Sequence, residues 1–591
     1  MPALQQVPQQ RVDSADGVRI AVYEEGNPDG PTVVLAHGFP DSHVLWDGVV
    51  PLLAKRFRII RYDNRGVGLS SVPKPVSAYT MARFADDFAA VIGQLSPGQP
   101  VHVLAHDWGS VGIWEYLTRP GASDRVASFT SVSGPSQDQL VDYLFSGLRR
   151  PWRPRTFARA ISQVLRFSYM LFFSIPVLAP LFLRLTLSIP ALRRNAVDNI
   201  PDGQIHHSDN LARDAARSVK TYPANYFRSF SRRGHAIHVV DVPVQLIVNT
   251  QDKYVRPYGY DETARWVPRL WRRDIKAGHF SPMSHPQVMA AAVHDFADLA
   301  EGKQSSRALL RAQVGRPRAS FGDTLVSVTG AGSGIGQATA LAFAREGAEV
   351  VISDIDEAAV KDTATQIAAR GGVAHAYALD VSDAEAVEAF AERVTAEHGV
   401  PDIVVNNAGI GHVGRFLDTP AEHFDRVLDV NLGGVVNGCR SFARRLVERG
   451  TGGHIVNVSS IAAYAPLQSM SAYCTSKAAT YMFSDCLRAE LDAAGIGLTT
   501  ICPCVIKTNI IQNTRIDAPA GKSEQVDGRR GQLEKMFVWR SYGPDKVAEA
   551  ILSSIKKNKP IRPVAPDAYA FYGVSRVAPQ ALRSAARLRL I

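Results

Sequence analysis

The chain has 591 residues, of which 46% are hydrophobic and 21% charged, a composition typical of folded globular protein rather than of disordered chain. That length exceeds a single hydrophobic core and fits two large α/β units. The formal net charge of +10 is compatible with anionic lipid, but no zinc pattern or aromatic–basic array accompanies it, so we do not expect nucleic acid as a partner.

The cysteine pattern and the first residues bear on the compartment. All five cysteines are scattered in the last third of the chain, which excludes a disulfide framework and favours a reducing cytoplasm. Cys502 and Cys504 have no further Cys or His nearby, so we expect no metal site. The opening MPALQQVPQQ lacks both the basic and the apolar region of a signal peptide.

The first half shows the pattern of a mostly parallel sheet. Helical spacing separates most of its short β-rich runs, which are residues 32–38, 57–63, 101–107, 127–134 and 244–252. Between Gly134 and about Val240 the strand signals stop, and Phe, Tyr, Leu and Arg recur at helical spacing. We therefore predict an α/β domain over residues 15–297, with an inserted helical cap at about 135–240.

Within this cap, residues 169–192 are strongly apolar. Arg184 and three prolines interrupt the run, and a central Arg costs about 2.5–3.5 kcal/mol on membrane-insertion scales. We predict that this stretch is not a transmembrane helix. It is expected to form an apolar lid over the site or a surface that contacts lipid.

The text VHVLAHDWGSVG predicts a strand that runs into a sharp turn with Asp107 at its tip. Hydrolases often carry a serine nucleophile at such an elbow, at the carboxyl edge of the sheet. A carboxylate there can attack a saturated carbon and form an ester, which water must then cleave with the help of a base. Asp252, after the strand VQLIVNT, and His279, in IKAGHFSP, follow in the order nucleophile, acid, histidine.

Together HGFP, RYDNRGVGLS, HDWG, Asp252 and His279 resemble the epoxide hydrolase branch of the α/β-hydrolase family. The resemblance implies that Asp107 opens the epoxide, that His279 activates water and that Asp252 steadies His279. It also implies that the backbone amides of Phe39 and Trp108 stabilise the oxyanion. Haloalkane dehalogenases share HDWG but usually carry Asn after the HG, so the Phe here favours epoxide over halide.

The cap departs from this family in one place. Epoxide hydrolases hold the epoxide oxygen with two cap tyrosines, and Tyr169 matches the first. The second lies in a motif like N-W-Y-R, which reads N-Y-F-R here, so Phe227 stands at its position unless Tyr226 takes its place. Loss of one such donor slows a reaction by about 10²–10³. The resemblance therefore predicts a slower hydrolase, or a packing role for Tyr169.

A polar, basic stretch at residues 298–322 predicts the linker to a second domain over 323–570. The strand-like runs LVSVTGAG, EVVISD, AHAYALD, DIVVNNAG, HIVNVSS and LTTICP begin a second α/β unit, a doubly wound parallel sheet of the Rossmann type. Residues 571–591 form a basic tail of loosely amphipathic pattern, compatible with a short helix or with disorder.

TGAGSGIG stands between a strand and a helix, where glycines let the backbone approach a pyrophosphate at the helix N-terminus. The residues expected to bind the cofactor in this loop are Gly330, Ser333, Gly334, Ile335 and Gly336. Asp354 ends the next strand, where a carboxylate binds the ribose hydroxyls of NAD and repels a 2′-phosphate. The sequence therefore favours NAD(H) over NADP(H).

Tyr473 and Lys477 are four residues apart and would share one face of a helix. A neighbouring cation would lower the pKa of the phenol and let it exchange protons near neutrality. Ser460 could hydrogen-bond the same substrate oxygen. With the glycine loop, NNAG and Asn431 in the same order, the second half closely resembles the short-chain dehydrogenase/reductase family.

That resemblance implies a catalytic tetrad of Asn431, Ser460, Tyr473 and Lys477, with the last two also contacting the cofactor. It further implies an adenine-side position for Asp380 and a scaffold position for Asn407. The family usually reads P-G-x-x-x-T after its sixth strand, whereas Cys504 stands here in place of the Gly. A non-Gly residue fits there if its φ is negative.

The whole chain resembles fusions of an epoxide-hydrolase-like domain with a short-chain dehydrogenase found in actinobacteria. We interpret it as a bifunctional enzyme that converts an epoxide, in our reading a long-chain lipid, to a vicinal diol and moves a hydride between NAD and an alcohol or ketone. The alternatives are a dehalogenase-like or weakly esterolytic first half, or a non-catalytic lipid-binding module. The expected partners are these small or lipid substrates, with peripheral contact at the inner membrane face and self-association through the second domain as further hypotheses.

Overall fold

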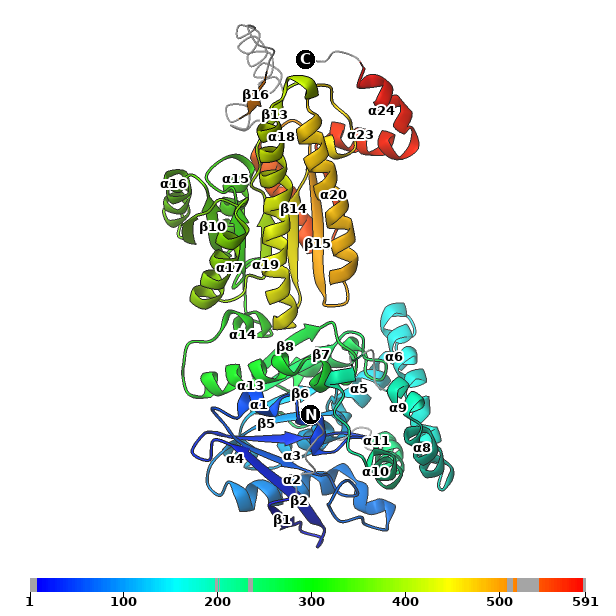
Figure 1. Ribbon diagram of the computed structural model, residues 1–591. Helices are drawn as coiled ribbons and strands as arrows, with labels where there is room; N and C mark the ends of the chain where they lie inside the picture. The colour runs from blue at the N-terminus through cyan, green and yellow to red at the C-terminus, as the bar shows by residue number, and fades with distance from the viewer. Residues whose placement is uncertain are drawn as a thin grey trace. The chain divides into compact units, whose positions relative to one another are not determined.

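The structure is a computed structural model that describes residues 8–196, 200, 202–231, 237–506, 514–517 and 542–587, without the side chains of 195, 196, 202 and 227–231. The chain forms two compact units, Met1–Arg316 and Pro317–Ile591, which are taken separately below (Figure 1). The division falls within residues 298–322, where the sequence analysis puts the linker.

The first unit contains an eight-stranded sheet in the order β1-β2-β4-β3-β5-β6-β7-β8. Its strands are β1 (Gln10–Asp13), β2 (Arg19–Gly26), β3 (Thr32–Ala36), β4 (Arg58–Tyr62), β5 (Val101–His106), β6 (Val126–Val132), β7 (Val244–Asn249) and β8 (Leu270–Ile275). The pairings β1–β2 and β2–β4 are antiparallel and the rest are parallel. The predicted parallel sheet is therefore confirmed, with an antiparallel edge that the sequence analysis did not identify.

Helices cover both faces of this sheet. Residues of α2 and α3 pack on one face with Val103 and Phe129, and residues of α1 and α13 pack on the other with Leu35 and Ile247. The helices outside the cap are α1 (Val50–Leu53), α2 (Met81–Leu95), α3 (Asp107–Leu117), α4 (Ala122–Arg125), α12 (Ser281–Ser284), α13 (Pro286–Ala300) and α14 (Arg307–Ala312). Two apolar layers thus hold the strand ends in fixed positions.

The stretch between β6 and β7 is helical where the structure describes it, as predicted for the cap. Its helices are α5 (Gln137–Leu148), α6 (Pro154–Arg166), α7 (Ser168–Phe173), α8 (Leu178–Ser188), α9 (Pro190–Ala196), α10 (Leu211–Ser218) and α11 (Thr221–Ser231). An apolar cluster joins the cap to the rest of the unit, because Leu183, Leu211 and Tyr222 pack with Trp108 and Phe84.

The second unit contains a seven-stranded parallel sheet in the order β11-β10-β9-β12-β14-β15-β17. Its strands are β9 (Leu325–Thr329), β10 (Glu349–Asp354), β11 (Val373–Ala378), β12 (Ile403–Asn406), β14 (Gly453–Val458), β15 (Ile496–Pro503) and β17 (Ile561–Val564), with a small separate pair β13 (His412–Val413) and β16 (Arg515–Ile516). The chain reverses direction across the sheet between β9 and β12, which confirms the doubly wound Rossmann arrangement.

Residues of α15, α16 and α22 pack on one face of this sheet, and residues of α17, α19 and α20 on the other. The helices of this unit are α15 (Gly334–Arg345), α16 (Glu357–Ala368), α17 (Ala384–His398), α18 (Ala421–Leu428), α19 (Gly434–Arg449), α20 (Ser471–Leu491), α22 (Pro544–Lys556), α23 (Pro566–Val577) and α24 (Pro579–Ala585), with the π-helix η7 (Asp429–Gly433) and the 3₁₀ helix η8 (Ile461–Ala463). The stretch interpreted as a basic tail thus begins within α23 and includes α24, whose Leu582 is buried.

Candidate active sites

Asp107 occupies a strained elbow between β5 and α3. Its φ is 48°, a left-handed conformation that non-glycine residues seldom adopt. Small residues make the turn possible: a Cβ on Gly109 would lie 2.2 Å from the carbonyl oxygen of His37, and one on Gly38 would lie 2.4 Å from Cβ of Asp107. The backbone is therefore bent so that the carboxylate stands at the carboxyl end of the sheet.

The two oxygens of Asp107 have different surroundings. The backbone N–H of Phe39 donates to Oδ2 at 2.9 Å, and the backbone N–H of Trp108 also hydrogen-bonds the carboxylate. Oδ1 lies 3.7 Å from Nε2 of His279. Burial raises the pKa of Asp107, while His279 and the two amides act in the opposite direction. Oδ2 thus accepts the amide of Phe39, and Oδ1 faces the imidazole.

His279 and Asp252 complete this group. Nδ1 of His279 lies 2.9 Å from Oδ2 of Asp252, and Oδ1 of Asp252 accepts the N–H groups of Tyr254 and Val255 at 2.7 and 3.0 Å. Burial opposes ionisation of Asp252, but His279 and these amides together lower its pKa. Asp252 is held as an anion that orients the imidazole, so the structure brings together the three residues predicted from sequence.

His106 was not predicted as a catalytic residue, but its side chain contacts the backbone of His279. Its Nε2 lies 2.9 Å from the carbonyl oxygen of His279. Burial, and then the neighbouring His279, lower the pKa of His106 to about 3, so its ring is neutral at physiological pH. Because a carbonyl only accepts, Nε2 must carry the proton. His106 therefore positions the loop that carries the imidazole.

Three tyrosines surround the carboxylate and the imidazole. The ring of Tyr169 on α7 lies 5.9 Å from that of Tyr222 on α11 and 5.3 Å from that of Tyr254. Tyr254 packs edge-on to His279 at 4.8 Å. Burial raises the pKa of both Tyr169 and Tyr222 well above 10, and the charge of Asp107 adds to this. Both phenols are thus protonated at neutral pH and able to donate.

Tyr222 is a candidate for the second cap tyrosine that the sequence analysis did not identify. The match to N-W-Y-R pointed to Phe227, whose side chain lies outside the described residues, or to Tyr226. Tyr222 instead is 4% exposed, hydrogen-bonds the Trp108 side chain and packs edge-on to Phe39 at 5.1 Å. It stands one helical turn and more before the motif position, so residue-by-residue matching could not find it. Only the packing of α11 beside α7, which brings Tyr222 next to Tyr169, identifies it.

The glycine loop of the second unit is shaped for close approach. Gly330 and Gly334 have φ values of 65° and 57°. A Cβ on Gly336 would lie 2.0 Å from the carbonyl oxygen of Gly330, so the turn tolerates no side chain there. Asn407 donates from Nδ2 to that same oxygen at 3.1 Å, which gives it the scaffold role that the resemblance implies. Ser333 and Ile335 line a cavity that begins at this loop, called the dehydrogenase cavity below.

Asp354 closes this loop from the end of β10. Its Oδ2 accepts the N–H of Gly332 at 2.8 Å, and its Oδ1 accepts that of Asp356 at 3.1 Å. Asp380 lines the dehydrogenase cavity. Hydrogen bonds from Ser382 and Arg426 lower the pKa of Asp380, although burial acts in the opposite direction. This combination of glycines and a carboxylate at the helix N-terminus fits the diphosphate and ribose of a dinucleotide.

Lys477 and Tyr473 lie in the first turns of α20. Nζ of Lys477 donates to the carbonyl oxygen of Val458 at 3.0 Å and stands 5.9 Å from the ring centre of Tyr473. Burial lowers the pKa of Lys477 to about 8. Burial also raises the pKa of Tyr473, although a hydrogen bond with Ser460 opposes this. The direction for Tyr473 differs from the sequence expectation, because burial outweighs any effect of the cation.

Asn431 lies in the π-helix η7, where its side chain bridges two segments. Its Oδ1 accepts the N–H of Ile410 at 2.8 Å, and its Nδ2 donates to Oγ of Ser476 at 3.1 Å. A Cβ on Gly409 would lie 3.0 Å from Oδ1 of Asn431 and 3.4 Å from Nζ of Lys477. The four predicted tetrad residues thus come to one end of the sheet, from η7, the start of η8 and α20.

Cys504 stands where the family usually has Gly. Its φ is not positive, so the backbone there is not strained by a side chain. It lines a cavity of about 740 Å³ that also contains the glycine loop, Ser460 and Tyr473. Apolar residues of the C-terminal helices and beside them also line this cavity: Phe571, Leu582, Ala585 and Ala586. The last helices of the chain therefore form part of the wall.

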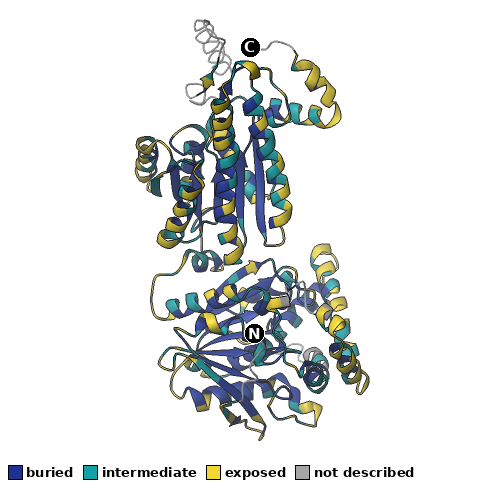
Figure 2. Ribbon diagram, in the orientation of Figure 1, coloured by how far each residue is buried: buried dark blue, intermediate teal, exposed yellow. Residues whose placement is uncertain are grey.

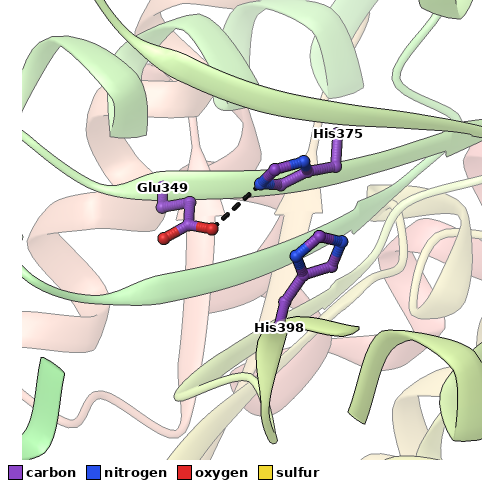
Figure 3. Close-up of side chains that lie close together, drawn as sticks. All are labelled: Glu349, His375 and His398. Atoms are coloured by element: carbon purple, nitrogen blue, oxygen red, sulfur yellow. Dashed lines mark hydrogen bonds and ion pairs between the residues drawn. The ribbon is translucent and has the colours of Figure 1, made fainter. Parts of the chain in front are cut away.

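A separate polar group lies at the start of β10, away from Asp354 (Figure 3). Nε2 of His375 is 2.9 Å from Oε1 of Glu349, and the rings of His375 and His398 stack at 3.9 Å with planes 23° apart. Nitrogen lone pairs lie in the ring planes, so stacked rings direct them side by side rather than toward one ion. The hydroxyl of Tyr377 lies 2.8 Å from Nε2 of His398. We interpret the group as a hydrogen-bonded stack that joins α17 to the sheet.

Comparison with known families agrees with the folds of both units. Residues 31–286 match the alpha/beta hydrolase fold, and residues 324–519 match the short chain dehydrogenase. Proteins of Mycobacterium bovis and Mycobacterium tuberculosis, each described as "Probable oxidoreductase EphD", are 82% identical over 593 residues, which covers 100% of this chain and of theirs. The chain belongs to the same family as these EphD proteins.

Other relatives match the second domain of this EphD-family chain alone. A C alpha-dehydrogenase of a Sphingobium species is 33% identical over 242 residues, 40% of this chain and 79% of its own. A solved short chain dehydrogenase/reductase of Burkholderia phymatum in complex with NAD is 28% identical, with a TM-score of 0.41, and covers 45% of this chain and 96% of its own. The second domain implies a nicotinamide cofactor, and the chain is an enzyme that joins a hydrolase-fold domain to a dehydrogenase domain.

No single helix among the described residues is both long and apolar enough to cross a membrane. One pair of segments, Pro154–Phe173 and Leu178–Ser188, reaches the required length and composition only when taken together, and it is bent by 98°.

Proposed function

We propose that the first unit hydrolyses an epoxide to a vicinal diol through an ester on Asp107. Oδ1 of Asp107 attacks an epoxide carbon, and the carbon–oxygen bond of the ring breaks. The departing oxygen takes a proton from Tyr169 or Tyr222, whose raised pKa values keep them protonated. The amide of Phe39 remains on Oδ2, which becomes the carbonyl oxygen of the ester, and the Trp108 amide stays hydrogen-bonded to the same carboxyl group.

The second step returns the carboxylate. His279 takes a proton from water, which attacks Cγ of Asp107, and charge develops on Oδ2, which accepts the Phe39 amide. The ester bond breaks toward the diol oxygen, which takes the proton of the hydroxyl that was added to Cγ. The proton held by His279 returns to the phenolate left by the first step, so Asp107 is restored as a carboxylate with one oxygen from water. Asp252, an anion 2.9 Å from Nδ1 of His279, stabilises the imidazolium formed on the way.

The asymmetry of the Asp107 carboxylate carries this proposal: the Phe39 amide donates to Oδ2, and the imidazole of His279 lies near Oδ1. The test is a single turnover of an epoxide of a long-chain fatty acid in ¹⁸O-water, with enzyme in excess. The diol should contain only ¹⁶O from Asp107, and ¹⁸O should appear in the protein. Full ¹⁸O incorporation into the first diol would mean direct attack by water. A binding module without catalysis would tolerate Asp107→Ala, whereas this mechanism does not.

For the second unit, the proposed reaction is NAD-dependent oxidation of a secondary alcohol or reduction of its ketone. When bound, the nicotinamide accepts or returns the hydride. Tyr473 takes or gives the proton of the substrate oxygen, and Ser460 hydrogen-bonds the same oxygen. Lys477 supplies positive charge beside the phenol. Asp354 supports the choice of NAD over NADP, because a 2′-phosphate would meet its carboxylate.

The substrate class proposed for both units is a long-chain lipid. Apolar residues that include Phe571 and Leu582 line the dehydrogenase cavity, and aromatic rings of the cap line the hydrolase site. A vicinal diol is a secondary alcohol, so the product of the first unit is chemically a substrate for the second. Tethering on one chain raises the local concentration of such an intermediate.

Coupling is tested with a long-chain epoxide and NAD. The expected product is a hydroxyketone, with NADH formed in step. Both Asp107→Ala and Tyr473→Phe should abolish NADH formation from epoxide, and added diol should rescue only the first variant. If added diol yields no NADH in the unmutated protein, the two units do not act in sequence.

A further inference from the structure

The cap carries an apolar surface of unusual extent. Figure 2 shows α6, α8 and α9 mostly in the exposed colour. The large apolar side chains exposed between residues 161 and 192 are Ile161, Val164, Leu165, Leu171, Ile175, Val177, Leu178, Leu181, Phe182, Leu185, Ile189 and Leu192. We call these residues the cap surface. Monomeric soluble proteins rarely leave so many neighbouring apolar side chains exposed without a partner.

Helix α8 shows why packing within the domain does not account for this surface. Its inner side buries Leu183 and Leu187 against the cluster that contains Trp108. Its outer side leaves Leu181 52% exposed and Leu185 59% exposed. A helix that is apolar all round is normally buried on all sides. The outer side of α8 therefore has the character of a surface that another apolar phase covers.

The charges in this part of the chain have one sign. Between residues 143 and 197 the sequence contains nine arginines and no Asp, Glu or Lys, although the whole chain has 56 acidic residues. Most of these arginines are exposed, among them Arg153, Arg155 and Arg184. Arginine side chains can lie along apolar groups while their guanidinium groups reach phosphates.

We propose that the cap surface docks on an anionic lipid bilayer. Apolar side chains enter the headgroup boundary, to a depth of about 5–10 Å for interfacial helices, and the arginines bind lipid phosphates. A second copy of the chain is a poorer occupant, because a two-fold interface would bring two sets of arginines together without a counter-charge. The 98° bend between the α6–α7 segment and α8 suits elements that lie in the interface.

The docked orientation would also deliver lipid to the hydrolase site. Helix α7 exposes Leu171 on its outer side, while Tyr169 and Phe173 pack inward with Tyr222. An epoxide on an acyl chain could pass from the bilayer along α7 to Asp107. This delivery rests on the proposed hydrolase function, whereas the docking itself does not.

The test is flotation of the full chain with vesicles of phosphatidylcholine alone or mixed with an equal part of phosphatidylglycerol. We expect binding to the mixed vesicles at low salt, weaker binding at high salt, and little binding to the neutral ones. Leu181→Glu with Leu185→Glu should lower binding about tenfold or more. Arg153→Gln, Arg155→Gln and Arg184→Gln together should lower it roughly 100-fold.

Matched controls separate the cap from other surfaces. Leu417→Glu changes a side chain that is 92% exposed in the second unit, and it should leave binding unchanged. Arg583→Gln with Arg587→Gln removes charge near the C-terminus and should also have little effect. Asp107→Asn should bind like the unmutated protein even if it hydrolyses nothing, so that failure of docking and failure of hydrolysis are distinguished. NAD-dependent turnover and thermal unfolding monitor folding of every variant.

Three outcomes would overturn the proposal. The first is absence of binding to the mixed vesicles at low salt. The second is equal binding by the unmutated protein and the Leu181→Glu, Leu185→Glu variant. The third is a dimer of the unmutated protein in sedimentation velocity that this variant disperses, because the cap surface would then belong to a second copy.

Discussion

Replacing Tyr222 by Phe tests the assignment that sequence comparison missed. The ring is kept, so its edge-on contacts with Phe39 at 5.1 Å and Trp108 at 5.4 Å remain and the cap should stay folded. Only the hydroxyl is lost. Because burial keeps the Tyr222 phenol protonated, that hydroxyl is available to the epoxide oxygen at any pH at which the enzyme works.

The size of the effect follows from the number of donors. Removal of one donor to a developing oxyanion costs about 10²–10³ in rate, or about 2.7–4 kcal/mol. Tyr169→Phe should show a loss of the same order, since both phenols lie in one buried group. The double variant should lose less than the product of the two, because residues that act on one atom are not additive.

The assay is the rate of ester formation in a single turnover, followed by quenching and mass measurement of the protein. Tyr226→Phe, on the same helix, and Tyr143→Phe, buried elsewhere in the cap, are matched controls that should keep the normal rate. If Tyr222→Phe forms ester at the normal rate while Tyr226→Phe is slow, the assignment of Tyr222 is wrong. Tyr226, next to the motif position, would then be the second proton donor.

Three further predictions concern stability, pH and cofactor choice. Arg65 and Asp87 form a pair with 0% and 1% of their side chains exposed, so Asp87→Ala should destabilise the first unit by about 3–5 kcal/mol in urea unfolding, whereas Asp142→Ala, which breaks an exposed pair, should cost less than about 1 kcal/mol. Burial raises the pKa of Asp107 above 3.8, and only its ionised form attacks, so the single-turnover rate should fall as pH drops through a midpoint above 3.8; a midpoint at or below that value would contradict the reasoning. By calorimetry NAD should bind at least about tenfold more tightly than NADP, and Asp354→Ala should narrow that gap, whereas equal affinities in the unmutated protein would exclude the role of Asp354.

Local signals in the sequence were enough for the fold class and for most of the site. Buried strands followed by glycine turns, as at HDWG and TGAGSGIG, have a short-range physical cause: only small residues fit where the backbone bends, and Gly109 and Gly336 leave no room for a Cβ. Chain order then related Asp107 to Asp252 and His279, and Tyr473 to Ser460. Such patterns depend on a few neighbouring residues, so they can be recognised without the tertiary structure.

Tertiary packing decided what depends on contacts between distant segments. Tyr222 joins Tyr169 only because α11 packs beside α7, and no spacing in the sequence encodes that approach. The C-terminal helices line the dehydrogenase cavity although their sequence resembles a loose basic tail. The pKa of Tyr473 is raised because burial, which is a property of the folded chain, outweighs the hydrogen bond with Ser460. The sequence of α8 shows that it is apolar, but only the fold determines which of its leucines remain exposed, because that depends on which side packs against the domain.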